Sequence, residues 1–258
     1  AALRAVYRPW LERTAQEFQA AVLERGLDTA PPETVAEGGC LLFVDGLRLD
    51  LGERLRGWLE ADGLKVDLSW RFAAQPSVTS TAKYAVSPIA GRLLPGLEFT
   101  PRNGKVQMNV NVLRRLLEAE GYTPLLEGDL GSGQGRAWTE CGDLDSLGHA
   151  GGAKLPSQLE RALEEVHERI QALLGAGWQE VRVITDHGWL LLPGGFPRFD
   201  LPEPLTEIRK GRCARLKEGV ETGFQTLPWR FDPSVRVALA PGIGVFVAGN
   251  EYEHGGLS

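Results

Sequence analysis

Cysteine, excess positive charge and long apolar runs are all missing or scarce in this sequence. Its 258 residues include only three cysteines, which cannot all pair, and none of them stands in a Cys-x-x-Cys motif. Free thiols in a reducing compartment are therefore favoured over disulfides or a cysteine metal site, and we expect a cytoplasmic protein. No apolar run approaches the roughly 18 residues of a membrane-spanning helix, so a membrane partner is not expected.

The charge balance argues against further classes of protein. The 28 lysines and arginines are outnumbered by 34 aspartates and glutamates, which gives a formal net charge of −6. This argues against a surface built wholly for nucleic acid or lipid, although a local phosphate site stays open. The sequence also lacks a complete P-loop, a Gly-x-Gly-x-x-Gly motif, a Gly-x-Ser-x-Gly elbow and a His-Glu-x-x-His motif. Any chemistry must therefore come from residues scattered along the chain.

What the sequence does contain is an alternation of apolar strands and amphipathic helices. Residues 40–44 and 181–185 are apolar runs of the kind found in parallel sheets that are covered on both faces. Helical spacing of apolar residues predicts helices near 51–63, 109–120 and 156–174. Short strands are predicted at 66–70, 235–239 and 245–248. We therefore expect an α/β fold with a central, mostly parallel sheet and helices on both faces.

Two regions fall outside this alternation. The first 35 residues have an amphipathic helical pattern that ends at Thr29-Ala30-Pro31-Pro32, and we interpret them as a helical lead-in to a catalytic domain at 36–258. Residues 193–233 are rich in proline and arginine and are predicted to form an inserted irregular region. Because the chain starts with alanine and stops abruptly, we interpret it as a domain excised from a longer protein.

Acidic residues and histidine follow the two predicted central strands. Asp45 comes directly after the first strand, and Asp186 and His187 follow the later one. Ligands of open α/β sheets bind beyond the carboxyl ends of the strands, where these residues are expected to meet. An Asp-Gly turn is an equally good explanation for Asp45 alone. An adjacent acid and imidazole at a strand end suits a divalent metal better than a turn.

The remaining histidines add to this group. Asp145 and His149 are four residues apart, so one helical turn brings both side chains toward the same ion. His254 precedes two glycines, which leave its imidazole uncovered. His167 lies within a predicted helix and is interpreted as a structural or surface residue. Three carboxylates and three imidazoles suit zinc, or alternatively manganese. Two ions with open positions are the usual clamp for phosphate-ester hydrolysis, and an unrelated scatter of ordinary residues is the alternative.

A candidate nucleophile lies in the hydroxyl-rich segment 76–83. This segment contains Thr79 and is expected to open a helix, whose N-terminus attracts phosphate and favours an alkoxide. A simple helix cap by serine or threonine is the more common explanation for such a residue. Only the surrounding ligands favour a catalytic role for Thr79.

These motifs resemble those of a known enzyme family. They occur in the order of the alkaline phosphatase superfamily: Val44-Asp45-Gly46-Leu47-Arg48, Pro76-x-x-Thr79, Asp145-x-x-x-His149, Thr185-Asp186-His187-Gly188 and His254-Gly255-Gly256. The residues that flank Asp45, Thr79 and His254 most resemble those of the PglZ branch. This branch occurs in bacterial phage-exclusion (BREX) systems and in some response regulators. The resemblance spans residues 40–258. It implies an alkaline-phosphatase-like sheet and, as partners, other phage-defence proteins.

The resemblance also assigns roles to individual residues. It implies two ions, one held by Asp45, Asp186 and His187 beside Thr79, and the other held by Asp145, His149 and His254. It implies that Thr79 is the nucleophile that takes the phosphoryl group. Lys83, one helical turn later, would be a phosphate contact, although the family has arginine there more often.

The function expected from these residues is hydrolysis of phosphate esters, with a phosphodiesterase acting on nucleotides or oligonucleotides as the first hypothesis. A phosphomonoesterase of the same superfamily is the nearest alternative, and a metal-stabilised scaffold module of a defence complex is the second. In residues 193–233, arginines and lysines alternate with aromatic residues, which suits single-stranded nucleic acid. A loop packed by its own aromatic side chains is the favoured alternative there.

Overall fold

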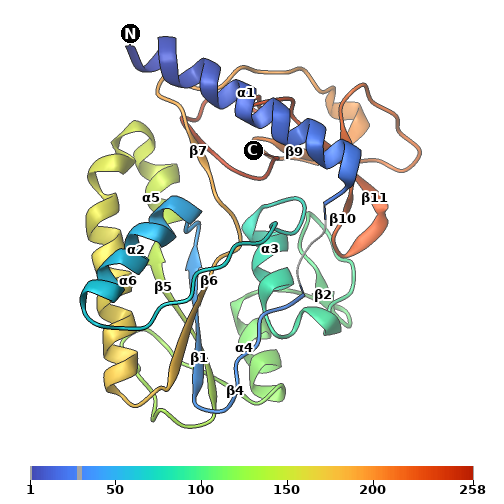
Figure 1. Cartoon of the computed structure of the whole chain (residues 1–258). Helices are drawn as coiled ribbons and strands as arrows, with labels where there is room; N and C mark the ends of the chain where they lie inside the picture. Colours follow the sequence, from blue (N-terminus) through green and yellow to red (C-terminus); the bar gives the residue numbers. More distant parts are fainter. Residues whose placement is uncertain (1, 28–30, 258) are drawn as a thin grey trace.

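The computed structural model describes residues 2–27 and 31–257 and is built around a parallel sheet (Figure 1). The strand order is β4 (Tyr122–Pro124), β5 (Arg136–Asp143), β1 (Gly39–Asp45) and β6 (Glu180–Ile184). All three pairings are parallel. The two apolar runs of the sequence are β1 and β6, which lie side by side. The predicted α/β class with a parallel sheet is thereby confirmed.

Helices cover both faces of this sheet because side chains alternate along β1. Leu41 and Phe43 contact the apolar side of α4 (Val110–Ala119) and of α3 (Thr79–Val86). Leu42 and Val44 face the opposite way and pack against α2 (Leu49–Ala61) and α6 (Leu159–Gly175). Each of the four β1 side chains is at most 2% exposed. An unbroken apolar strand is thus buried on both sides, as its composition requires.

The residues that precede the predicted helices decide where each helix begins. Asn109 precedes α4, and its side-chain oxygen accepts hydrogen bonds from the amides of Asn111 and Val112 at 3.0 and 3.1 Å. The helix expected over 156–174 starts only at Leu159, because Pro156 lies in a separate 3₁₀ turn, η2 (Gly152–Ser157). Further short elements complete this half of the molecule: η1 (Ala90–Arg92), β2 (Arg102–Asn103), β3 (Val106–Gln107) and α5 (Leu144–Gly151).

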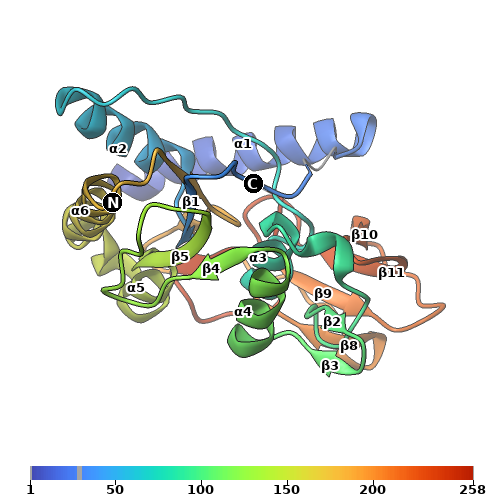
Figure 2. The same ribbon diagram turned by 90° about the horizontal axis from the view of Figure 1, so that it is seen from below.

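Residues 193–233 are less irregular than predicted, because short strands interrupt the loops. They contribute η3 (Glu203–Leu205), β8 (Thr206–Arg209), β9 (Cys213–Leu216) and β10 (Thr226–Trp229). With β11 (Asp232–Leu239) these strands form an antiparallel sheet of order β10-β11-β9-β8, which lies beside α3 (Figure 2). Strands of four residues offer only one or two inward side chains each, so the sequence carries too little alternation to reveal them.

Aromatic side chains in and beside this second sheet pack into apolar clusters. Trp229 is 1% exposed and packs in one apolar cluster, and half-buried Phe199 and Phe224 pack against another that contains Phe246. This favours the self-packed alternative over an aromatic surface for single-stranded nucleic acid. Two other predicted strands do not form. Residues 66–70 have no strand partner, and of 245–248 only Val245 makes an isolated bridge, to Arg198.

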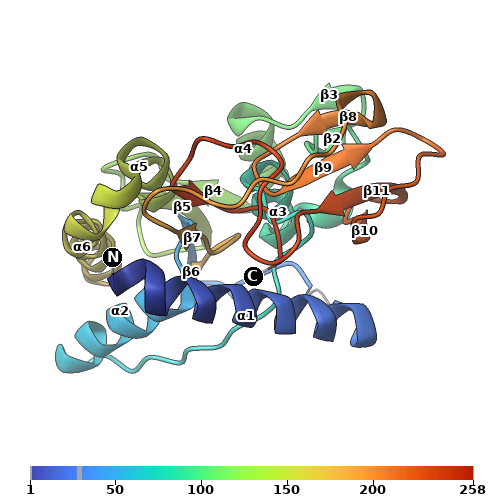
Figure 3. The ribbon, with the colours of Figure 1, turned by 90° about the horizontal axis from the view of Figure 1, so that it is seen from above.

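The N-terminal helix is present as predicted and lies along the C-terminal part of the chain (Figure 3). α1 (Ala2–Arg25) carries Gln19, whose side chain exchanges hydrogen bonds with the amide and carbonyl of Gly242 at 2.8 and 3.0 Å. Leu11 of the same helix packs against Leu190 of β7 (Leu190–Leu191), which pairs with β12 (Tyr252–Glu253). Within the expected linker, Thr29 and Ala30 lie outside the described residues. No helix in the described part of the chain is long and apolar enough to span a membrane.

Candidate metal centre

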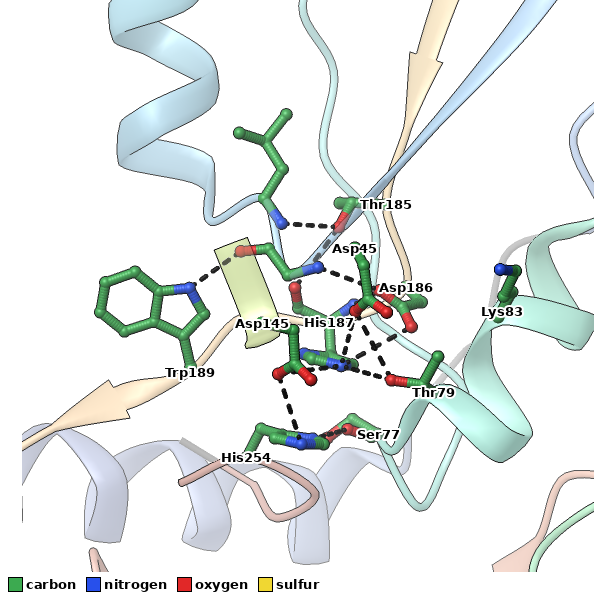
Figure 4. Close-up of polar contacts among 12 residues, drawn as sticks. Asp45, Ser77, Thr79, Lys83, Asp145, Thr185, Asp186, His187, Trp189 and His254 are labelled. Atoms are coloured by element: carbon green, nitrogen blue, oxygen red, sulfur yellow. Dashed lines mark hydrogen bonds and ion pairs between the residues drawn. The ribbon is translucent and has the colours of Figure 1, made fainter. Parts of the chain in front are cut away.

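The carboxyl edge of the parallel sheet brings together the residues that the motifs single out (Figure 4). The strand β1 ends at Asp45, and β6 runs directly into Asp186 and His187. The third strand, β5, runs into α5, which carries the remaining acid and one more histidine, and the last imidazole comes from the segment after β12. Residues up to 209 positions apart in the sequence thus share one site: Asp45, Thr79, Asp145, His149, Asp186, His187 and His254.

His187 is the centre of the first group. Its Nε2 lies 3.1 Å from the Thr79 hydroxyl, 3.4 Å from Asp45 Oδ1 and 3.6 Å from Asp186 Oδ2. A third carboxylate, that of Asp145, lies 3.9 Å away through Oδ1. One ring nitrogen is therefore surrounded by four oxygen atoms at 3.1 to 3.9 Å. The His187 side chain is only 1% exposed, so this arrangement is fixed by packing.

The second group is a triangle of ligand atoms. His149 Nε2 and His254 Nε2 lie 3.2 Å apart. Asp145 closes the triangle, with Oδ2 at 3.5 Å from His149 and Oδ1 at 3.5 Å from His254. His149 is the most exposed of the three side chains, at 44%, so this group lies nearer to solvent than the first.

These spacings are close to those of atoms that coordinate one metal ion. Ligand bonds of about 2.0–2.1 Å place neighbouring ligand atoms roughly 2.8–3.4 Å apart in octahedral or tetrahedral geometry, and the candidate ligand atoms here lie 3.2–3.9 Å apart. Two sets of three, Asp45-Asp145-His187 and Asp145-His149-His254, have all their ligand atoms within 4.8 Å of one another. Asp186 Oδ2 is buried and makes no hydrogen bond to any described residue, although such an atom normally has a partner. The residues therefore fit a divalent cation.

Two backbone carbonyls orient the imidazoles for this purpose. His187 Nδ1 lies 3.1 Å from the carbonyl oxygen of Gly188, and His254 Nδ1 lies 3.2 Å from that of Ser77. A carbonyl only accepts, so each Nδ1 carries the proton and donates it, which leaves the Nε2 lone pair directed into the site. Metal-binding histidines in proteins are usually held in this way. The two rings stack in parallel, with centroids 4.0 Å apart.

The charges of the site are unfavourable without a cation. Burial, followed by Asp186 and Asp145, raises the pKa of Asp45 to about 8. Burial also raises the pKa of Asp186. Burial and the neighbouring His187 lower the pKa of His254 to about 4. The protein thus holds carboxylates together where their negative charges repel, and a divalent cation is the ligand that would offset this repulsion.

These shifts predict different pH dependences with and without metal. Between pH 6.5 and about 8 the unfolded Asp45 is already ionised, whereas the folded carboxyl still holds a proton, so metal-free stability should fall as pH rises through this range. The lowered pKa of His254 opposes this trend only below about pH 6.5. With zinc bound the fall should disappear, because metal binding displaces protons and strengthens with pH. Melting temperatures of chelator-treated and zinc-loaded protein test this, and a rise for the metal-free protein would contradict it.

The structure distinguishes the two interpretations of Thr79. Thr79 is the first residue of α3, and the capping position belongs to Val78, which makes no side-chain cap. The Thr79 hydroxyl instead points into the site, 3.1 Å from His187 Nε2 and 3.5 Å from Asp45 Oδ1. Thr79 is thus placed by the helix start and is not used to cap it.

Lys83 does not join the cluster. Its ammonium forms an ion pair with Glu140 at 2.7 Å and lies 4.6 Å from the centre of the Phe43 ring. Figure 4 shows Lys83 on the same helix as Thr79, without a contact to the other residues drawn. The expected contact with phosphate would require Lys83 to leave Glu140.

Sequence reasoning missed three residues that support the site. The hydroxyl of Tyr252 donates a hydrogen bond to Asp145 Oδ1 at 2.9 Å. Trp189 Nε1 donates to the carbonyl of Gly46 at 2.8 Å, next to Asp45, and Ser77 supplies the carbonyl that orients His254. Burial and Asp145 raise the pKa of Tyr252, so its hydroxyl keeps the proton that it donates. Tyr252 stands two residues before His254, and its position there was the only available signal.

Comparison with known proteins adds nothing to the resemblance to the alkaline phosphatase superfamily, which rests on the motifs alone. The chain matches no protein-family model and no curated protein.

Proposed function

We propose that this chain is a metal-dependent hydrolase of phosphate esters, first of all a phosphodiesterase, of the alkaline-phosphatase-like type and its PglZ branch. The observation that carries the proposal is the Thr79 hydroxyl at 3.1 Å from a histidine nitrogen that is surrounded by carboxylate oxygens. A nucleophile beside a complete set of metal ligands is expected of a hydrolase and has no use in a scaffold. Two ions, zinc or alternatively manganese, are proposed as cofactors.

The motifs imply how the ligands would divide between the two ions. Asp45, Asp186 and His187 would hold one ion, and His149 and His254 would belong to the other. Asp145 lies close to both groups. When bound, such ions neutralise the charge of the phosphate, favour the alkoxide of the nucleophile and activate water. The ligand side chains themselves are largely pre-positioned by the strand ends and by the Nδ1 hydrogen bonds.

Thr79 would then act in two steps that exchange bonds at phosphorus. In the first, Thr79 Oγ1 loses its proton and forms a bond to phosphorus, while the bond from phosphorus to the leaving alcohol breaks and the alcohol oxygen takes up a proton. In the second, water loses a proton and forms the new bond, the bond from Oγ1 to phosphorus breaks, and Oγ1 takes up a proton, which restores the threonine. The N-terminus of α3 places a positive dipole beside the attacking oxygen.

The cations near Thr79 favour a diester over a monoester substrate. A monoester carries up to two negative charges and is usually held by additional free cations. Lys83 is paired with Glu140, and Arg48, from the motif that contains Asp45, is paired with Asp50. A diester with a single negative charge needs no further cation. Nucleotides or oligonucleotides are the proposed substrates, and phage-defence proteins are the proposed partners.

A comparison of two chromogenic substrates tests the function. The protein, freed of metal by a chelator and reloaded with zinc, manganese or magnesium, is assayed with bis-p-nitrophenyl phosphate and with p-nitrophenyl phosphate. We expect turnover with zinc or manganese, and a kcat/KM at least about tenfold higher for the diester, because the cations near Thr79 are already paired and a diester needs no further cation. A tenfold ratio corresponds to about 1.4 kcal/mol. The reverse ratio would identify a phosphomonoesterase. Bound metal without turnover of either substrate would support the scaffold alternative and reject the proposal.

A further inference from the structure

Asp145 occurs in both groups of candidate ligands, although the motifs assign it to one ion only. Resting on the proposed two-ion function, we propose that the Asp145 carboxylate bridges the two ions and that Tyr252 is the positioning residue that fixes it in the bridging orientation. Tyr252 touches neither Thr79 nor the phosphate in this proposal and acts only through Asp145.

The two oxygens of Asp145 face different partners. Oδ2 lies 3.5 Å from His149 Nε2, in the more exposed group. Oδ1 lies 3.5 Å from His254 Nε2 and 3.9 Å from His187 Nε2, which belongs to the buried group. One carboxylate thus reaches histidines of both groups. Its side chain is 15% exposed, so it lies between the buried and the open halves of the site.

A carboxylate that faces two groups needs a third contact to stop its rotation. The Tyr252 hydroxyl supplies it by donating to Oδ1 at 2.9 Å. This hydrogen bond takes up one lone pair of Oδ1 and leaves the other, together with Oδ2, for metal. Partners of this kind set the orientation of metal-binding side chains, and their loss typically weakens metal affinity by 10- to 100-fold.

Tyr252 is itself held rigidly, as a positioning residue must be. It is 1% exposed and lies in β12, which pairs with β7. Its ring packs edge-on against His149, with centroids 4.9 Å apart, and against Trp189 at 5.3 Å. The turn of α5 that carries Asp145 comes so close that a Cβ at Gly148 would lie 2.1 Å from the Tyr252 ring. The absence of a side chain at Gly148 therefore permits the contact.

The test is the metal affinity of Tyr252→Phe, which keeps the ring and removes the hydroxyl. Binding of Zn²⁺ to the metal-free chain is titrated in competition with a chromogenic chelator, and the number of ions per chain is measured. We expect Tyr252→Phe to bind both ions 10- to 100-fold more weakly. Loss of one hydrogen bond should lower the melting temperature of the metal-free variant only modestly, so that it stays folded during the titration. Tyr122→Phe is the matched control: Tyr122 is also buried, at 3%, but lies at the start of β4, and its affinity for both ions should equal that of the unsubstituted chain.

A second pair of variants tests the bridge without relying on Tyr252. Asp145→Asn should weaken both ions, whereas His149→Ala should weaken one and leave the other bound. Weakening of a single ion in Asp145→Asn would overturn the bridge, and unchanged affinities in Tyr252→Phe would overturn its positioning role. If the unsubstituted chain binds no metal at all, the proposed function fails instead, so the two failures are distinguishable.

Discussion

Replacing Thr79 with alanine is expected to reduce hydrolysis of bis-p-nitrophenyl phosphate by roughly a thousandfold or more, because the attacking oxygen is removed. The six candidate metal ligands remain, so metal content should stay near that of the unsubstituted protein. This combination separates loss of the nucleophile from loss of the centre. Turnover is measured by release of p-nitrophenol, and metal by elemental analysis of the same samples.

Thr79→Ser is the control for this experiment, because serine keeps the hydroxyl at the first position of α3. It should retain a substantial part of the activity. If Thr79 forms a covalent intermediate, a rapid acid quench during turnover should leave a phosphorylated peptide containing Thr79, detectable by mass spectrometry. Undiminished turnover in Thr79→Ala would show that another group, such as water, attacks the phosphate directly.

Replacing Asp186 with asparagine is expected to abolish activity by a different route, through loss of metal. Asp186 Oδ1 accepts hydrogen bonds from the amides of His187 and Gly46 at 3.0 and 3.3 Å, and an asparagine oxygen can keep both. Oδ2, the buried oxygen without a hydrogen bond, becomes an amide nitrogen that cannot bind a cation. The fold should persist while the affinity of the first ion falls by at least about a hundredfold.

The direction of the change in melting temperature shows whether Asp186 serves metal binding or the fold. Without metal, Asp186→Asn removes a buried charge whose pKa burial raises, and it relieves repulsion on Asp45, so this variant should melt no lower than the unsubstituted protein. With zinc present, only the unsubstituted protein should gain stability, as a ligand bound to the native state requires. A lower melting temperature of the metal-free variant would instead show that Asp186 serves the fold.

Asp143→Asn is the matched control for this prediction. Asp143 is also an aspartate at the end of a strand, β5, and is exposed. It belongs to neither of the two candidate ligand groups. Its replacement should therefore change the zinc-induced gain in melting temperature little. An equal loss of zinc stabilisation in both variants would mean that general negative charge, and not a specific ligand, attracts the metal.

The sequence allowed two of the four strands of the central sheet, β1 and β6, to be predicted, because both are largely apolar. It did not reveal β5, which mixes polar and apolar residues, or β4, which has only three residues. The run at 40–44 has no polar residue, so burial on both faces is its only stable arrangement, and Asp45 after it must lie at the carboxyl edge. The second sheet could not be predicted in the same way. Strands such as Cys213–Leu216 are only four residues long and contain an arginine. β9 pairs with β8, just before it, and with β11, across the intervening β10, and no long apolar run in the sequence marks either pairing.

The same contrast holds at the site. The candidate metal ligands could be identified from the sequence, because aspartate and histidine at strand ends are conspicuous in a chain with only four histidines. How these residues divide into two groups could not be predicted from the sequence. The motifs place Asp145 with His149, but its second neighbour, His187, comes from another strand. The ion pair between Lys83 and Glu140 could not be predicted either, since the two residues are 57 positions apart in the sequence.

By itself, the sequence determined the α/β class, the apolar central strands and the residues able to bind metal, because periodicity and residue chemistry are local properties of the chain. Only the tertiary structure decided that Thr79 faces His187, that Asp145 lies between two groups of ligands and that Tyr252 holds it. These facts depend on distances of about 3 Å between side chains from separate strands and loops. Such distances are fixed by the packing of the whole domain, which no short segment encodes.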